Sequence, residues 1–399
     1  MSGAVDDESA SRQVMAARVA VSTGFFMFGL ALAVWAVHIP VITARLVLDP
    51  GILGLALLNV GLGGVISQPL TGWLVARIGS RPATVALLPL FFVAFLAPIV
   101  AWNTPLFFAA TFILGAAGGG ANVAINTQGS EIERARHRPT MSSFHGFFSL
   151  GALAGATLGS GIIAVGWHNG SGAALVATAL FVAALVATRF LLPSAPAAPP
   201  SGGERAPRFA LPARAILGLA ALTFLANTVE GAVNDWSALY LSTVRGFSAA
   251  VAASGFAAFS LAMAICRLAG GPVVARFGEK SIVRVGGALM ALGMGVVVLS
   301  PWAALSPLGF ALVAIGAANT IPVMMGVASR VPGVAPSAGV AATATGALLG
   351  FLIGPPIIGF VAHALGLSVA LGMLSVVGIV LVVGASLYRW PARIPQSAA

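Results

Sequence analysis

Two carboxylates differ from the other acidic residues of this chain by their surroundings. Of ten acidic residues, only Glu230 and Asp235 lie within a long apolar stretch. An ionised carboxylate is costly inside a membrane, and such residues mark ion or substrate pathways. Asn227, Glu230 and Asn234 follow spacings of three and four residues, which place them on one face of a helix. This pattern predicts a site for a polar solute and a proton.

Two further titratable groups are candidates for proton coupling. Asp235 lies about 140° around the helix from Glu230 at 100° per residue, which suits a gate or a cap. His145, in the sequence FHGFFSLG, can exchange protons near neutral pH. These residues also have structural alternatives. Glu230 and Asp235 would be structural groups held in salt bridges, and His145 would form a hydrogen bond to the region of Glu133.

Arg267 is the only basic residue in the interior of an apolar stretch, away from its ends. It precedes Arg276 by nine residues, or about 13 Å at 1.5 Å per residue. We expect Glu230 to lie deeper, so the spacing favours a structural partner near the inner surface over a direct pair with Glu230.

Aromatic and amide side chains at helical spacings are candidates for lining the solute site. Trp35 and His38 are three residues apart, and Trp236 corresponds to Trp35 when the two halves of the chain are aligned. These rings would stack against the ring of a sugar-like solute, or they would belong to an aromatic belt at the membrane interface. The amides of Asn122, Asn126 and Asn319 would line the cavity or hold helices together.

The chain contains no pattern typical of catalysis or nucleotide binding. It has no HExxH sequence or acidic cluster in its apolar stretches, and Gly118 to Gly120 are not followed by Lys and Ser or Thr. The single cysteine, Cys266, excludes an internal disulfide and a cysteine-based metal cluster. We therefore expect no enzymatic activity, no metal and no cofactor.

The composition requires a membrane. The chain has 399 residues, of which 59% are hydrophobic and only 8% charged. A membrane-spanning helix needs about 20 apolar residues. Twelve stretches have about this length. They are 18–39, 52–75, 82–101, 105–128, 141–166, 172–192, 215–241, 249–275, 283–299, 308–328, 338–361 and 367–388.

The basic residues predict the orientation of these spans. If the N-terminus is cytoplasmic, two of the 20 Lys and Arg residues, Arg45 and Arg245, lie outside and Arg267 lies in a span. The cytoplasmic side then holds the rest, which are Arg12, Arg18, Arg77, Arg81, Arg134, Arg136, Arg138, Arg189, Arg205, Arg208, Arg214, Arg276, Lys280, Arg284, Arg330, Arg389 and Arg393. By the positive-inside rule, both termini are cytoplasmic. The net charge of +10 then faces anionic lipid, and we expect no nucleic-acid partner.

One long polar connection divides the chain. The stretch Leu191 to Arg208 is rich in Pro, Ala, Gly and Ser, which is typical of a linker. We predict an N-terminal bundle of six helices over 1–192, a cytoplasmic linker over 193–213 and a C-terminal bundle over 214–399. The solute site of such a protein lies between the bundles at mid-membrane.

A short loop sequence occurs once in each half. GWLVARIGSR begins at Gly72 and GPVVARFGEK begins at Gly271, an offset of 199 residues. Matched pairs half a chain apart indicate a duplicated bundle. The positions that define the repeat are Gly72, Arg77, Gly79 and Arg81 in the first copy, and Gly271, Arg276, Gly278 and Lys280 in the second.

This repeat resembles the loops between helices two and three and between helices eight and nine of the major facilitator superfamily. The resemblance implies an all-α membrane protein of twelve transmembrane helices, in two six-helix bundles related by a pseudo-two-fold axis. The family pattern carries an Asp before the basic residue, where this chain has Ala76 and Ala275. If that Asp helps transporters of the family to lock their closed state, this protein must lock its closed state by other contacts.

Three longer stretches narrow the resemblance. EIERARHRPTMSSFHGFFSLGALAG begins at Glu131, VEGAVNDWSALYL at Val229 and GFLIGPPIIGF at Gly350. Together they resemble the YbjJ-like branch, which is related to rhizopine transporters and distantly to fucose–proton symporters. The resemblance implies a transporter of the bacterial inner membrane that works by alternating access. Glu230 with its amide neighbours predicts proton coupling to a small polar or sugar-like solute, and we expect a monomer. Proton-driven efflux of drugs or metabolites is the alternative. The fifth helix lacks the GxxxGP typical of that class, which weakly disfavours efflux.

The charge distribution generates a test of topology. A cysteine that replaces Ser201, in the predicted linker, should react with a membrane-impermeant thiol reagent only after the cells are opened. Labelling of Ser201→Cys in intact cells would overturn the orientation.

Overall fold

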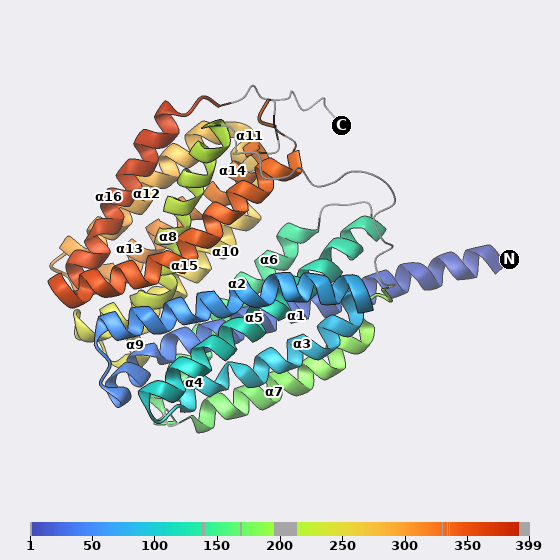
Figure 1. Ribbon diagram of the computed structural model, residues 1–399, viewed down its shortest axis with the longest axis horizontal. Coiled ribbons are helices and arrows are strands. Elements are labelled where there is room, and N and C mark those ends of the chain that lie inside the picture. Colours follow the sequence, from blue (N-terminus) through green and yellow to red (C-terminus); the bar gives the residue numbers. More distant parts are fainter. Residues whose placement is uncertain are drawn as a thin grey trace.

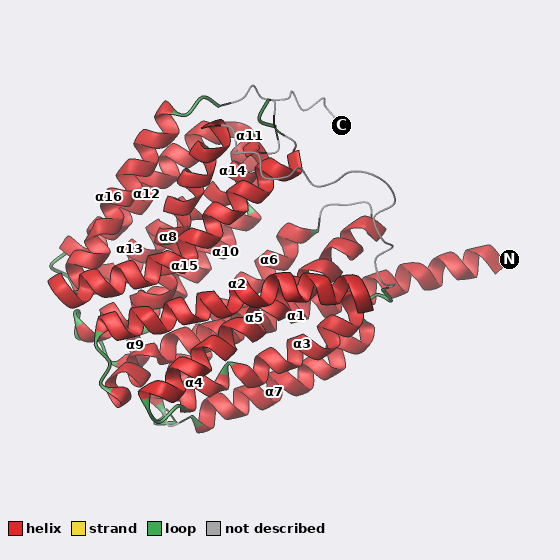
Figure 2. Ribbon diagram, in the orientation of Figure 1, coloured by secondary structure: helices red, strands yellow, loops and turns green. Residues whose placement is uncertain are grey.

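The computed structural model describes residues 2–136, 140–167, 170–194, 214–328, 330–332, 334 and 336–390. Within these ranges the chain forms helices and loops without any strand, as Figure 2 shows. The predicted all-α class is therefore confirmed. Most of the predicted linker, residues 195–213, lies outside the described residues.

The helices of the first bundle correspond to the first six predicted spans. They are α1 (Ser2–Leu46), α2 (Pro50–Ile78), α3 (Ser80–Ala94) with α4 (Leu96–Val100), α5 (Thr104–Arg136), α6 (Met141–Ala164), and α7 (Ser171–Ala187) with the 3₁₀ turn η1 (Thr188–Phe190).

The helices of the second bundle correspond to the other six. They are α8 (Arg214–Thr243), α9 (Ala249–Ala252) with α10 (Ser254–Leu268) and α11 (Gly270–Phe277), α12 (Glu279–Leu299), η2 (Ala303–Leu305) with α13 (Ser306–Ala317) and α14 (Thr320–Ala328), α15 (Pro336–Leu365) and α16 (Leu367–Leu387). In the described part of the chain, 11 helices are long and apolar enough to cross a membrane, or 12 if the bent pair α10–α11 is one span.

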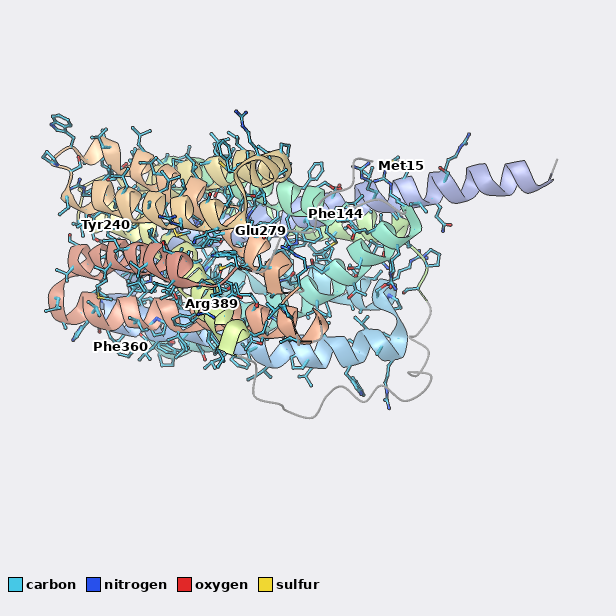
Figure 3. All side chains as sticks on the ribbon, turned by 90° about the horizontal axis from the view of Figure 1, so that it is seen from above. Met15, Phe144, Tyr240, Glu279, Phe360 and Arg389 are labelled. Carbon is cyan, nitrogen blue, oxygen red and sulfur yellow. The ribbon has the colours of Figure 1, made fainter. Side chains whose placement is uncertain are left out.

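Each bundle has two ends that differ in charge. We call the end with the repeated loops, which carry Arg77, Arg81, Arg276 and Lys280, the basic side, and the other end the opposite side. In the second bundle, Figure 3 shows Glu279 and Arg389 toward one end and Tyr240 and Phe360 toward the other. The ribbons of the two bundles converge on the opposite side and diverge toward the basic side (Figure 1).

The duplication predicted from the repeated loops recurs in the backbone. Gly79 and Gly278 both have positive φ, 90° and 83°, and each joins two helices in a tight turn. A side chain is strained in this conformation, which explains glycine at both positions. Asp49 caps the start of α2. Ser248 lies 199 residues later, the same offset as between the repeated loops, and caps the start of α9.

Polar contacts at the basic side also occur in pairs. The Ser80 hydroxyl donates to Glu131 Oε2 at 2.6 Å. The residues 199 positions later, Glu279 and Arg330, form an ion pair. Each contact joins the start of the third helix of its half to the end of the fourth. The same helix junction is therefore held by different chemistry in the two halves.

Glycines allow helices within a bundle to pack closely. A Cβ atom at Gly115 of α5 would lie 1.8 Å from the carbonyl oxygen of Val60 on α2. One at Gly151 of α6 would lie 1.9 Å from the Phe26 carbonyl oxygen on α1. Small residues are the usual means of close helix packing in membranes, where the hydrophobic effect does not drive helices together.

The two bundles meet tightly on the opposite side. A Cβ atom at Gly54 of α2 would lie 3.1 Å from Gly359 Cα on α15. At the same end, His363 Nδ1 lies 3.2 Å from Asp49 Oδ1 across the bundle interface. These side chains are 63% and 38% exposed, so the pair adds at most about 1 kcal/mol. At the basic side, no atom lies within 4 Å of a Cβ built on Gly72 or Gly271.

The glycine contacts generate a stability prediction. Gly115→Ala places a methyl group against the α2 backbone, and we expect a loss of about 1–3 kcal/mol in the free energy of unfolding, as for other overpacked sites. Gly161→Ala in the same bundle is the control, because nothing lies within 4 Å of its Cβ position. Thermal unfolding of the purified variants should separate them. Equal melting temperatures would contradict the packing argument.

Candidate functional site

Glu230 lies in the middle of α8, beside the helix that precedes the bend in the second bundle. Its Oε1 atom is 3.1 Å from Nη2 of Arg267 on α10. The two side chains are only 15% and 21% exposed. A charge in such surroundings is tolerated when it is paired, because pairing offsets part of the desolvation cost. The structure thus places an acid and a base together within the predicted spans.

This pair corrects the expectation drawn from spacing. The expectation from the sequence counts the depth of Arg267 from Arg276 along one straight helix. That count places Arg267 nearer the inner surface than Glu230, and therefore favours another partner. The chain instead bends by 65° between α10 and α11. A distance along the chain therefore does not give the depth of Arg267. The long arginine side chain also places its charged end far from its own Cα atom.

Arg267 also lies next to the first bundle. A Cβ atom at Gly146 of α6 would lie 3.1 Å from Leu268 Cδ2 on α10, so these two helices touch beside Arg267. His145 directly precedes Gly146, so it lies on the turn of α6 that meets α10. His145 is exposed, and its ring packs edge-on against Phe25 with centroids 5.2 Å apart. The base and the histidine thus come from different bundles.

The structural alternative for His145 involved the region of Glu133. Glu133 Oε2 instead accepts backbone N–H bonds from Thr140 at 2.6 Å and from Met141 at 2.9 Å. It stabilises the start of α6, where unpaired backbone donors need acceptors. The proton-coupling role of His145 stays a prediction.

The polar neighbours of Glu230 on α8 differ in their contacts and exposure. The Asn227 amide donates to the Ala347 carbonyl oxygen on α15 at 2.5 Å. Asn234 and Asp235 are partly exposed, further toward the opposite side. The structure therefore separates Asp235 from the Glu230–Arg267 pair along the helix. The proton-coupling role of Asp235 stays a prediction, and so does the binding of solute by Asn227 and Asn234.

The aromatic candidates are packed inside their bundles. Trp35, His38 and Trp236 are all buried. The Trp35 ring lies 6.1 Å from that of Phe107, and His38 Nδ1 is 2.7 Å from the Val34 carbonyl oxygen. A solute can reach these rings only if neighbouring side chains move. Their role in solute binding stays a prediction.

The amide candidates form hydrogen bonds of two kinds. On α5, Asn126 Nδ2 donates to the Asn122 carbonyl oxygen at 2.8 Å and also contacts its side-chain oxygen. Asn122 is exposed, as expected for a side chain that faces a cavity or the surface. Asn319 Nδ2 donates to the Cys266 carbonyl oxygen on α10 at 3.0 Å. Asn319 thus contacts the residue that immediately precedes Arg267.

The repeated loops hold their arginines without the acidic residue of the family pattern. Arg77 stacks over the Trp73 ring at 4.5 Å and Arg276 over Phe277 at 5.5 Å. Such cation–π contacts suit an arginine at the membrane surface. Arg81 instead donates from its backbone N–H to Ser194 Oγ at 2.8 Å.

Sequence reasoning missed a buried amide near the first loop. Gln128 is fully buried, and its Nε2 donates to Ser80 Oγ at 2.6 Å and to Glu131 Oε2 at 3.0 Å. It also exchanges hydrogen bonds with the backbone of Leu192, the last residue before the predicted linker. The offset of 199 would have revealed part of this network, because it maps Ser80 and Glu131 onto the opposite charges of the second half.

The chain matches the model of one protein family and relatives over most of their length. The model of the Major Facilitator Superfamily matches residues 19–333 and 219–399. An uncharacterized MFS-type transporter of Yersinia pestis is 34% identical over 358 residues, which cover 89% of this chain and 91% of that protein. Membrane protein MosC of Rhizobium meliloti is 32% identical over 361 residues, covering 90% and 87%.

Solved structures share the fold at lower identity. A D-xylose-proton symporter has a TM-score of 0.75 at 16% identity, covering 94% of this chain and 98% of that one. A mutant of the nucleoside transporter NupG has a TM-score of 0.76 at 12% identity, covering 92% and 98%. At these identities the structures indicate a common architecture.

The Glu230–Arg267 pair generates a prediction of stability. At pH 8, Arg267→Met leaves a buried carboxylate without its cation, and we expect a loss of about 3 kcal/mol, at the low end for buried pairs because this one is partly exposed. Adding Glu230→Gln should recover much of that loss, since no unpaired charge remains. Thermal unfolding in detergent measures both. The pair contributes nothing if the single and double variants unfold like the unmodified protein.

Proposed function

This chain belongs to the major facilitator superfamily, and we propose that it is a proton-coupled secondary transporter of a small polar, sugar- or polyol-like solute. The observation that carries the proposal is the ion pair between Glu230 and Arg267, 3.1 Å apart within the predicted spans. Intramembrane ionisable pairs are typical of proton and substrate pathways.

The chemistry of the pair suits coupling. When Glu230 is ionised, Arg267 neutralises it and the site carries no net charge. When Glu230 takes up a proton, Arg267 loses its ionic partner and its guanidinium becomes a donor for a hydroxyl or carbonyl oxygen of the solute. Proton and solute then favour the same state of the site, which is the requirement for moving them together.

The location of the pair supports alternating access. Arg267 lies beside α6 of the first bundle, where Leu268 contacts Gly146. A rocking motion of the bundles changes the surroundings of a site at their interface. On the opposite side the bundles meet through α2 and α15, where Gly54 approaches Gly359.

The class of solute follows from the available partners. Apart from the ion pair, the candidate lining groups are neutral amides, the buried rings of Trp35 and Trp236, and His38. Amides and aromatic rings suit an uncharged solute rich in hydroxyl groups. The same fold serves a D-xylose-proton symporter. Efflux of drugs or metabolites remains the alternative direction and cargo, and a panel of polyols, inositols, sugars and drugs in proteoliposomes, with and without a pH gradient, separates the two.

The role of Glu230 generates the principal functional prediction. Glu230→Gln mimics a permanently protonated carboxyl group at nearly unchanged volume. We expect this variant to retain solute counterflow and to lose uptake driven by a pH gradient, because it cannot release a proton. Glu230→Asp should keep coupling with a shifted pH optimum. Both reactions are measured with purified protein in liposomes.

Asp235→Asn is the control for this experiment. It removes the other acid of α8 and should impair transport without selectively abolishing coupling. If Glu230→Gln still concentrates solute against its gradient with normal pH dependence, Glu230 is not the proton carrier. The role then passes to Asp235 or His145.

A further inference from the structure

We propose that Asn319 is a positioning residue that holds the bend of the eighth span and thereby keeps Arg267 against Glu230. The inference rests on the proposed function only in the use it assigns to that pair. Asn319 need not touch the solute for this role, because it acts through the backbone of α10.

The bend has a cause in the sequence. Helix α10 ends at Leu268 and α11 begins at Gly270, with 65° between them. Pro272 lacks the N–H that would bond to the Leu268 carbonyl oxygen, and its ring crowds that carbonyl. Gly270, the first residue of α11, carries no Cβ at the point where Asn319 approaches the chain. The last carbonyl groups of α10 therefore need hydrogen-bond donors from elsewhere.

Asn319 supplies one of these partners. It lies between α13 and α14, where the tenth span is also interrupted. Its Nδ2 donates to the Cys266 carbonyl oxygen at 3.0 Å. Its Oδ1 faces Gly270, where a Cβ atom would lie only 2.1 Å away. Two interrupted helices are thus joined at one point, and glycine at position 270 is required for the amide to fit.

The first half of the chain makes the same contact with the roles exchanged. The counterparts of Gly270 and Asn319, 199 residues earlier, are Thr71 and Gly120. A Cβ atom at Gly120 would lie 3.0 Å from Thr71 Oγ1. There, α2 and α5 continue through the contact without interruption. The position of Pro272 is occupied by Trp73. The fold itself therefore does not require the bend or the amide.

The departures from symmetry coincide with the ion pair. Arg267 replaces Gln68 of the first half. Cys266, whose carbonyl Asn319 holds, directly precedes Arg267, and Leu268 directly follows it against Gly146 of α6. The last turn of α10 is thus fixed from two sides. Loss of the amide bond should free this turn and weaken the contact of Arg267 with Glu230.

The test is a double-mutant cycle between Glu230→Gln and Arg267→Gln, read as melting temperature in detergent. The cycle is repeated in the Asn319→Ala background. We expect the coupling between the two residues to fall by at least half in that background. The pH profile of the melting temperature between about pH 5 and 9 should move in the same direction as in Arg267→Gln.

Asn59→Ala is the matched control. Asn59 Nδ2 donates to the Phe108 carbonyl oxygen at 2.7 Å, the same kind of bond between α2 and α5 in the first bundle. This variant should lower the melting temperature without changing the coupling or the pH profile. The proposal is wrong if Asn319→Ala does no more than Asn59→Ala.

A second variant tests the proposal if Asn319→Ala folds poorly. The exchange Gly270→Thr with Asn319→Gly recreates the pair of the first half and preserves close packing while removing the amide bond. It should show the same loss of coupling, and unchanged coupling there overturns the proposal. None of these readouts uses transport. Retained pH-driven uptake in Glu230→Gln would therefore refute the proposed function and leave this inference to be decided by the cycle.

Discussion

The cost of placing a charge inside a membrane governs the arrangement of this protein. Glu230 is tolerated in the middle of α8 because Arg267 lies 3.1 Å away, and Arg267 is tolerated for the same reason. Neither residue can be ionised alone at low cost. A proton that neutralises Glu230 therefore changes what Arg267 requires, and this dependence is what a coupled transporter needs.

The duplicated fold separates structural contacts from functional ones. Contacts that recur at the offset of 199, such as the caps at Asp49 and Ser248 and the turns at Gly79 and Gly278, define the ends of spans. The ion pair, the bend and the Asn319 bond occur in the second half, where the first half keeps continuous helices. Departures from internal symmetry therefore locate the candidate site better than any single residue does.

Much of the fold could be predicted because apolar length is a direct physical requirement of a membrane. The twelve spans, the two bundles and the superfamily were predicted correctly from apolar stretches and from the loops that begin at Gly72 and Gly271. The pairing of Arg267 with Glu230 was not, because depth was inferred along a straight helix. Gly270, Gly271 and Pro272 signalled the bend. No pattern could show that Asn319 reaches Cys266, since that contact depends on how two spans pack.

The central claim is that Glu230 is the group that exchanges a proton, with Arg267 as its counter-ion. Infrared titration of the purified protein between about pH 5 and 9 measures this directly, through the carbonyl stretch of protonated carboxyl groups. The account predicts a titrating band that disappears in Glu230→Gln, persists in Asp235→Asn and changes its midpoint in Arg267→Gln. A titrating band that is unchanged in Glu230→Gln and lost in Asp235→Asn would contradict it.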